Sequence, residues 1–130
     1  MALNRARDIH AAQNTVRGIV SNGATWYETV LLTDENGAQL TGVSSDTWQF
    51  QFRKDPTSDA ADLTLSTTAG TLTVTEGAST TTLLINVAQS ALDDMEGDYV
   101  ADLVSKATGD SRLTHRAHGI VTFRADPIAF

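Results

Sequence analysis

The residues of this chain that could carry chemistry are histidines and carboxylates, and the histidine spacing does not favour a metal site. His115 and His118 are three positions apart, a spacing that would support metal binding on a helix. In an extended strand the two side chains are expected to point to opposite faces. The remaining histidine is His10, far away in the sequence. The pattern therefore predicts no zinc site.

A run of acids at Asp93, Asp94, Glu96 and Asp98 offers oxygen ligands of the kind that calcium prefers. Its spacing does not match the twelve-residue calcium-binding loop. Acids are also common at the start of a short helix or turn, where they face the helix dipole. We expect neither a bound metal nor a cofactor.

Motifs for catalysis are missing as well. The sequence has no nucleophile elbow, no phosphate-binding Gly loop and no cysteine, which excludes a Cys nucleophile, a thiolate metal site and a disulfide framework. Paired carboxylates for glycoside hydrolysis are easy to imagine among 16 acids, so their presence is uninformative. We predict a protein that is not an enzyme and that is made in a reducing cytoplasm.

Charge is distributed unevenly along the chain, whose net charge is −7. Residues 28–110 hold fourteen acids against three basic residues, a net charge of −11, whereas the two ends hold six Arg against two Asp, a net charge of +4. Such an acidic body repels phosphate, so nucleic acid is not an expected partner. One interpretation is that the acidic surface and the basic ends are simply solvated. The other is that the basic ends dock onto the acidic bodies of neighbouring copies.

The elements that must position these groups are predicted to be β-strands. Short alternating apolar and polar runs recur between Gly, Asp, Asn and Ser turns. The clearest is DTWQFQFR, with Trp48, Phe50 and Phe52 on one face, which predicts a central strand. The other expected strands are residues 15–20 (an edge strand), 24–33, 63–66 and 72–75 (a hairpin), 80–87, 98–105 and 112–124, the last with a bulge near Gly119.

The chain length indicates one domain with a single core. We expect an all-β fold, an immunoglobulin-like β-sandwich of seven or eight strands with one short helical turn at residues 88–95, capped by Ser90. Residues 1–14 are predicted to form a short helix or a flexible arm, residues 15–124 the sandwich, and residues 125–130 a tail. No apolar run suggests a signal peptide or a membrane span.

Several short motifs together resemble a known family. They are residues 22–26 (NGATW), 34–37 (DENG), 40–42 (LTG), the aromatic strand ending in Arg53, 95–103 (MEGDYVADL) and 119–123 (GIVTF). In this order they resemble the N-terminal immunoglobulin-like domain of baseplate upper proteins of tailed phages and its single-domain relatives among phage tail and structural proteins. The resemblance covers most of the chain. It implies a virion assembly module without enzymatic residues.

On this basis we expect a non-enzymatic structural protein of a tailed bacteriophage virion, a tail, baseplate or tail-fibre-adaptor component that docks neighbouring subunits. Its partners would be other virion proteins and copies of itself, in a homo-oligomer without nucleic acid or membrane. The residues expected to dock neighbouring subunits are the following: Arg5, Arg7, Arg112, Arg116, Arg124, Ile128 and Phe130.

Other functions remain open at this point. A capsid decoration protein would share the fold and composition and differ in copy number and place on the particle. A carbohydrate-binding module would expose a planar set of aromatics, for which Trp26, Tyr27, Trp48 and Tyr99 are the candidates. Each lies in an alternating strand, so we expect core or interface packing instead. A cellular adhesion or chaperone-like sandwich is disfavoured by the lack of an expected signal peptide.

Overall fold

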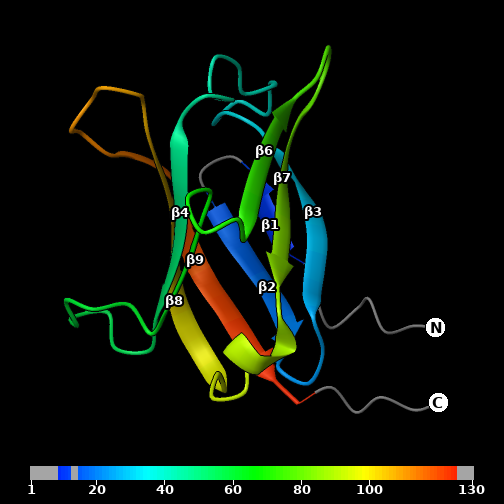
Figure 1. Ribbon diagram of the computed structural model, residues 1–130, viewed down its shortest axis with the longest axis vertical. Helices are drawn as coiled ribbons and strands as arrows, with labels where there is room; N and C mark the ends of the chain where they lie inside the picture. The colour runs from blue at the N-terminus through cyan, green and yellow to red at the C-terminus, as the bar shows by residue number, and fades with distance from the viewer. Residues whose placement is uncertain (1–8, 13–14, 126–130) are drawn as a thin grey trace.

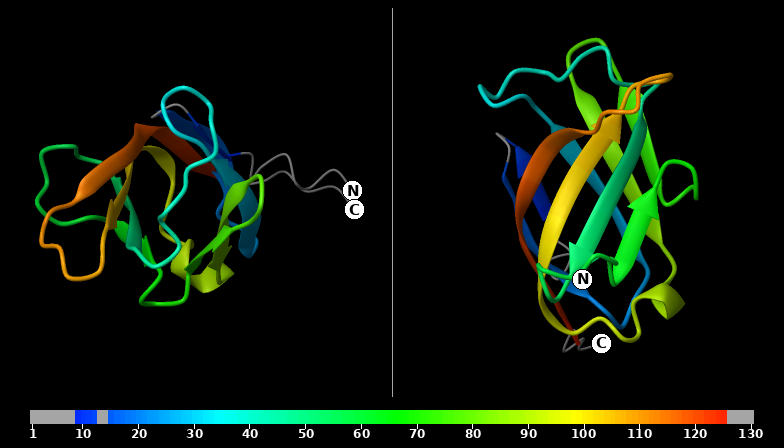
Figure 2. Two further views of the ribbon diagram at one scale, coloured as in Figure 1. Left: turned by 90° about the horizontal axis from the view of Figure 1, so that it is seen from above. Right: turned by 90° about the vertical axis from the view of Figure 1, so that its left-hand side faces the viewer.

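The computed structural model describes residues 9–12 and 15–125, which form two β-sheets packed face to face (Figures 1 and 2). The six-stranded sheet has the order β1-β2-β9-β8-β4-β5, and the three-stranded sheet has the order β3-β7-β6. The strands are β1 (Ile9–Ala12), β2 (Thr15–Ser21), β3 (Trp26–Leu32), β4 (Thr47–Arg53), β5 (Leu63–Ser66), β6 (Leu72–Glu76), β7 (Thr81–Val87), β8 (Gly97–Lys106) and β9 (Thr114–Arg124). The expected all-β sandwich is confirmed.

An aromatic cluster fills the space between the sheets. Trp26 of β3 lies 5.9 Å from the rings of both Phe52 and Phe123, which come from the opposite sheet. Tyr99 packs edge-on against Phe123. The predicted alternation of β4 is confirmed, since Trp48, Phe50 and Phe52 are fully buried. One face of each sheet therefore supplies the core, as period-2 patterning requires.

The strand β2 lies inside the six-stranded sheet, so its expected place at an edge was wrong. It pairs with β9 in parallel and with β1 antiparallel. A Cβ on Gly119 would lie 1.7 Å from the carbonyl oxygen of its partner Val16, so only glycine fits there. A bulge was expected near Gly119 from the sequence. In the structure this glycine instead allows β2 and β9 to approach each other closely.

The strand β1 was not foreseen. Residues 9–12 form a strand rather than the helical alternative expected for this segment, and β1 lies close to β3 as well as pairing with β2. Residues 1–8, 13–14 and 126–130 lie outside the described residues, so the rest of the expected arm and all of the expected tail except Ala125 lie outside them.

The strands β5 and β6 do not form the expected hairpin. β5 pairs with β4, and β6 pairs with β7 in the other sheet. The chain crosses between the sheets at Thr71, whose N–H donates to the carbonyl of Ser66 while its hydroxyl accepts from the Ser66 N–H. Alternation on both sides of a tight turn is shared by hairpins and crossovers, so the pattern alone could not distinguish them.

The bulge in β9 lies three residues before the expected place. Leu103 faces Ala117 and Val104 faces His115, which leaves Arg116 as the extra residue. The connection between β8 and β9, residues 107–113, projects from the sandwich (Figure 1). The helical turn near residue 90 is a 3₁₀ turn, Gln89–Ala91; its N-cap is Ala88, which makes no side-chain cap, so the predicted Ser90 cap was wrong. Within the described residues, no helix has the length and apolar character needed to cross a membrane.

Candidate functional site

The outer face of the three-stranded sheet carries no charged side chain. Alternation along β3, β7 and β6 directs one residue in two away from the core. The outward residues, here called the uncharged face, are Tyr27, Thr29, Leu31, Thr73, Thr75, Thr82, Leu84 and Asn86. On a protein with a net charge of −7, eight adjacent neutral positions form a distinct surface.

The opposite outer face differs in kind. It holds charged residues from four neighbouring strands, and two of its aspartates hydrogen-bond to side chains of the adjacent strand. His118 Nδ1 donates to Asp102 Oδ1 at 2.6 Å, and Thr122 Oγ1 donates to Asp98 Oδ1, also at 2.6 Å. Arg17 and Arg53 lie at outward positions of the same sheet. This face is a solvated polar surface whose charges partly satisfy each other.

Two apolar side chains stand out on the uncharged face. Tyr27 is 59% exposed and Leu31 is 51% exposed, and both come from β3. In the register of the sheet, Tyr27 is opposite Asn86 and Leu31 is opposite Thr82, with Thr29 and Leu84 between them. Cores of protein interfaces are depleted in charge and enriched in Tyr, because buried charges are costly to desolvate. The chemistry of the uncharged face is that of a docking surface.

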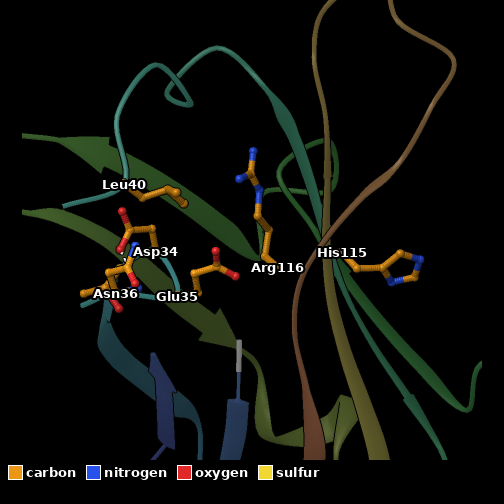
Figure 3. Close-up of a pocket in the computed structure, with 7 residues that line it drawn as sticks. Asp34, Glu35, Asn36, Leu40, His115 and Arg116 are labelled. Carbon is orange, nitrogen blue, oxygen red and sulfur yellow. Dashed lines mark hydrogen bonds between the residues drawn. The ribbon is translucent and has the colours of Figure 1, made fainter. Parts of the chain in front are cut away.

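A small cleft lies at one end of the sandwich, between the β3–β4 connection and the start of β9 (Figure 3). Its volume is about 220 Å³, and Asp34, Glu35, Leu40, His115 and Arg116 are among its lining residues. Asp34 Oδ1 accepts hydrogen bonds from the N–H groups of residues 36 and 38 and so shapes the turn. His115 points away from the acids in Figure 3. The acids and the histidine therefore do not converge on one point in the cleft.

Arg116, one of the residues predicted to dock neighbouring subunits, is bound within its own chain. Its Nε donates to Ser105 Oγ at 2.8 Å, and its guanidinium lies 3.7 Å from Asp46 and 5.6 Å from the centre of the Trp48 ring. The side chain is 24% exposed. The bulge in β9 positions it there, and an alternation pattern does not reveal a bulge.

The other predicted docking residues are dispersed. Arg112 is highly exposed and pairs with Asp110 two residues away, and Arg124 is exposed at the end of β9. Neither lies on the uncharged face. Arg5, Arg7, Ile128 and Phe130 fall outside the described residues. The structure thus brings none of these described arginines together. The uncharged face was not singled out from the sequence, although the Thr-rich runs in the sequence were a signal for an exposed sheet.

The histidines also behave differently from the expectation. His115 is opposite Val104 and His118 is opposite Asp102, two positions on one face of β8, so the bulge brings both histidines to the same side. The acidic run is divided: Gln89 hydrogen-bonds to Asp93, whereas Asp98 is bound to Thr122 on the outer sheet face. Among the described residues, no three His, Asp or Glu side chains are grouped to hold a metal ion.

The aromatic candidates for sugar stacking are mostly in the core. Trp26, Trp48 and Tyr99 are buried, as expected, and Tyr27 alone of the four is exposed. A carbohydrate platform needs several coplanar rings at the surface. One tyrosine does not supply it.

No protein-family model matches this chain, and no curated protein matches it. The function is therefore argued from the surface and its chemistry.

Proposed function

We propose that this protein is a non-enzymatic structural subunit of a tailed-phage virion, and that it docks a neighbouring virion protein through the uncharged face. The observation that carries the proposal is the absence of charge from the eight outward positions of the three-stranded sheet, with Tyr27 and Leu31 exposed among them. A tail or baseplate position follows from the sequence resemblance. Capsid decoration would use the same surface at a different place on the particle.

The proposed immunoglobulin-like type of the sandwich is supported by strand order. Constant-type immunoglobulin domains place their second, fifth and fourth strands in one sheet and their third, sixth and seventh in the other. Numbering from β2, and leaving out β5 as an additional strand that pairs with β4, the neighbours β3-β7-β6 and β4-β8-β9 follow this arrangement. Sandwiches of this kind present two broad faces, and here one of them is neutral.

The expected partner presents a neutral or weakly polar patch. An acidic body repels other acidic surfaces, and salt weakens this repulsion without removing it at short range. Contact through the uncharged face avoids both like-charge repulsion and the desolvation of ionised groups. The basic residues Arg112 and Arg124 lie outside this face, in the β8–β9 connection and at the end of β9, so they can affect the rate of association only through the longer-range field of the protein.

The test is a pair of charge insertions on opposite faces. Leu31→Lys places a charge in the uncharged face, and Ile120→Lys places one on the other sheet, where the native side chain is similarly exposed at 47%. We expect the first variant to enter assembled particles at least about tenfold less than the wild type, and the second to enter normally, with both folding alike. Equal incorporation of Leu31→Lys and the wild type would refute docking through this face.

A further inference from the structure

The strand β6 has a free edge whose backbone groups are oriented for pairing. It is the outermost strand of the three-stranded sheet, next to β7. The Asn86 N–H donates to the carbonyl of Thr71, and the Gly77 N–H donates to that of Thr80. Both pairs continue the register of the β6–β7 ladder, in which hydrogen-bonded and non-hydrogen-bonded pairs alternate. Leu72, Val74 and Glu76 therefore direct their N–H and C=O groups away from β7.

Other sheet edges in the described part of the chain are shorter or covered. The outer side of β3 lies close to β1. On β5, the outward N–H and C=O of Ser66 are both bound to Thr71. Natural edge strands are commonly protected by charged side chains, Pro or a bulge. The strand β6 (LTVTE) has no Pro, Lys or bulge, and the carboxylate of its one charged residue, Glu76, is bound by the N–H groups of Gly42 and Val43. Three alternate residues, Leu72, Val74 and Glu76, direct their backbone N–H and C=O groups to the free edge and can pair with a further strand.

We propose that β6 pairs antiparallel with β6 of a second copy of this chain, about a two-fold axis at Val74. In this register Val74 faces Val74 of the second copy. Leu72 of each copy faces Glu76 of the other copy. Each of these three residue pairs can exchange two backbone hydrogen bonds, because all of their N–H and C=O groups point to the free edge. The two three-stranded sheets then form one continuous sheet of six strands.

The side chains fit a second copy better than a generic extended peptide. Thr73 faces Thr75 of the other copy in both directions, a favourable cross-strand pair. Val74, which is half-buried at the border of the core, is covered by its own counterpart. The two Glu76 carboxyl groups lie four residues apart along the strand, about 13 Å, which exceeds the screening length at physiological salt. A shift that paired Glu76 with itself would place like charges opposite, and the Val74 register avoids this while pairing all three free residues of the edge.

The pairing does not depend on the virion role proposed above, because it uses the edge of the sheet rather than its outer face. It doubles the width of the uncharged face on one side of the dimer. Three residue pairs bury less surface than a standard-sized interface of roughly 1,600 Å². The dimer is therefore expected to be weak and to depend on concentration.

Cysteine cross-linking of the full chain tests the pairing and its register together, because the native sequence has no cysteine. In the proposed dimer the Cα atoms of two Val74→Cys residues are about 5.5 Å apart, within the range that a disulfide spans. Two Thr75→Cys residues are offset by two positions along the strands, about 8 Å apart, and cannot be joined without backbone movement. Mixing Thr73→Cys with Thr75→Cys chains places the two different cysteines opposite each other.

Oxidised glutathione supplies the oxidant, so that each inter-chain disulfide forms as two glutathione thiols are released. We expect Val74→Cys to link at least about tenfold faster than Thr75→Cys alone, and the mixture to yield mainly the mixed disulfide. Thr64→Cys, at an exposed position of β5, measures the rate of disulfide formation by random collision. A Val74→Cys rate no greater than that of Thr64→Cys, or equal linking by Thr75→Cys alone, would overturn the proposal.

A proline variant supplies a test without cross-linking. Because the Val74 N–H points away from β7, Val74→Pro removes no bond of the native ladder but blocks the centre of the dimer. Sedimentation should show the wild type moving from monomer to dimer as concentration rises to about 1 mM, and Val74→Pro staying monomeric while circular dichroism shows that it is folded. Thr64→Pro is the matched control and should dimerise. Wild-type protein that remains monomeric over the whole range contradicts the inference.

Discussion

Gly119 passes so close to Val16 that an added Cβ would lie 1.7 Å from the Val16 carbonyl oxygen. The two residues are partners in the parallel ladder that joins β2 to β9. We predict that Gly119→Ala separates these strands and lowers the free energy of unfolding by at least about 2 kcal/mol, because neither backbone can move aside cheaply. Urea denaturation monitored by tryptophan fluorescence measures the loss.

Gly23→Ala is the matched control for this substitution. A Cβ at Gly23 would meet Ser21 Oγ at an ordinary 3.8 Å, and its backbone is not in the left-handed region. The control should change stability by no more than about 0.5 kcal/mol. Similar stability for the two variants would show that the close approach is not the constraint.

Arg116 is predicted to stabilise the fold. Arg116→Ala removes the hydrogen bond to Ser105, the contact with Asp46 and the position over the Trp48 ring. The ion pair with Asp46 contributes little because water screens it. The hydrogen bond and the cation–π contact together account for a loss of about 1–2 kcal/mol in the free energy of unfolding. Arg112→Ala, at a highly exposed pair, should cost less than about 0.5 kcal/mol. Thermal unfolding of both variants checks the difference, and equal losses would be inconsistent with this role.

Trp26 is predicted to be the most costly core residue to truncate. It contacts aromatic rings from β4 and β9 and is fully buried, so Trp26→Ala should lower the free energy of unfolding by about 3–5 kcal/mol. The neighbouring Tyr27→Ala, on the uncharged face, should cost less than about 1 kcal/mol. If chemical denaturation gives similar losses for the two, the face assignment of β3 is wrong.

Glu76 is predicted to make stability depend on pH. Its carboxylate accepts hydrogen bonds from the N–H groups of Gly42 and Val43, which hold the pKa of this carboxyl below its usual value. A lowered folded-state pKa means that stability is present above the unfolded-state pKa and is lost as pH falls through and below the usual glutamate range.

Glu76→Gln removes this titration. We expect the wild type to be the more stable at about pH 7 and the difference to shrink towards about pH 3 in denaturant titrations. The lowered pKa values of Asp55, bound by Thr57, and Asp110, bound by Arg112, affect both proteins equally. A difference that does not vary with pH would contradict the assignment to Glu76.

The sequence was sufficient to predict the all-β class, most strands and the core. Period-2 alternation in β4 predicted which of its residues are buried, because burial of one sheet face imposes that period. Partner choice was harder to predict. The strands β5 and β6 lie in different sheets, β2 pairs with β9, and β1 pairs with β2. These arrangements depend on contacts between residues distant in sequence, which a local pattern does not predict.

The candidate surface was only partly predictable. Thr-rich runs in residues 71–75 and 80–82 suit an exposed sheet, but their lack of charge becomes a surface property only when β3, β7 and β6 are neighbours. The arginines were chosen from the charge asymmetry along the chain. Charge counting does not detect a partner within the chain, and Arg116 has three such contacts because a bulge turns it towards Trp48.

The most direct test of the proposed function is to locate the protein on purified tailed-phage particles from its source by immunogold electron microscopy, with mass spectrometry to count copies. The account predicts label at the tail or baseplate. Label over the head at high copy number would instead identify capsid decoration. Absence of the protein from purified particles would contradict the central claim that it is a structural virion subunit.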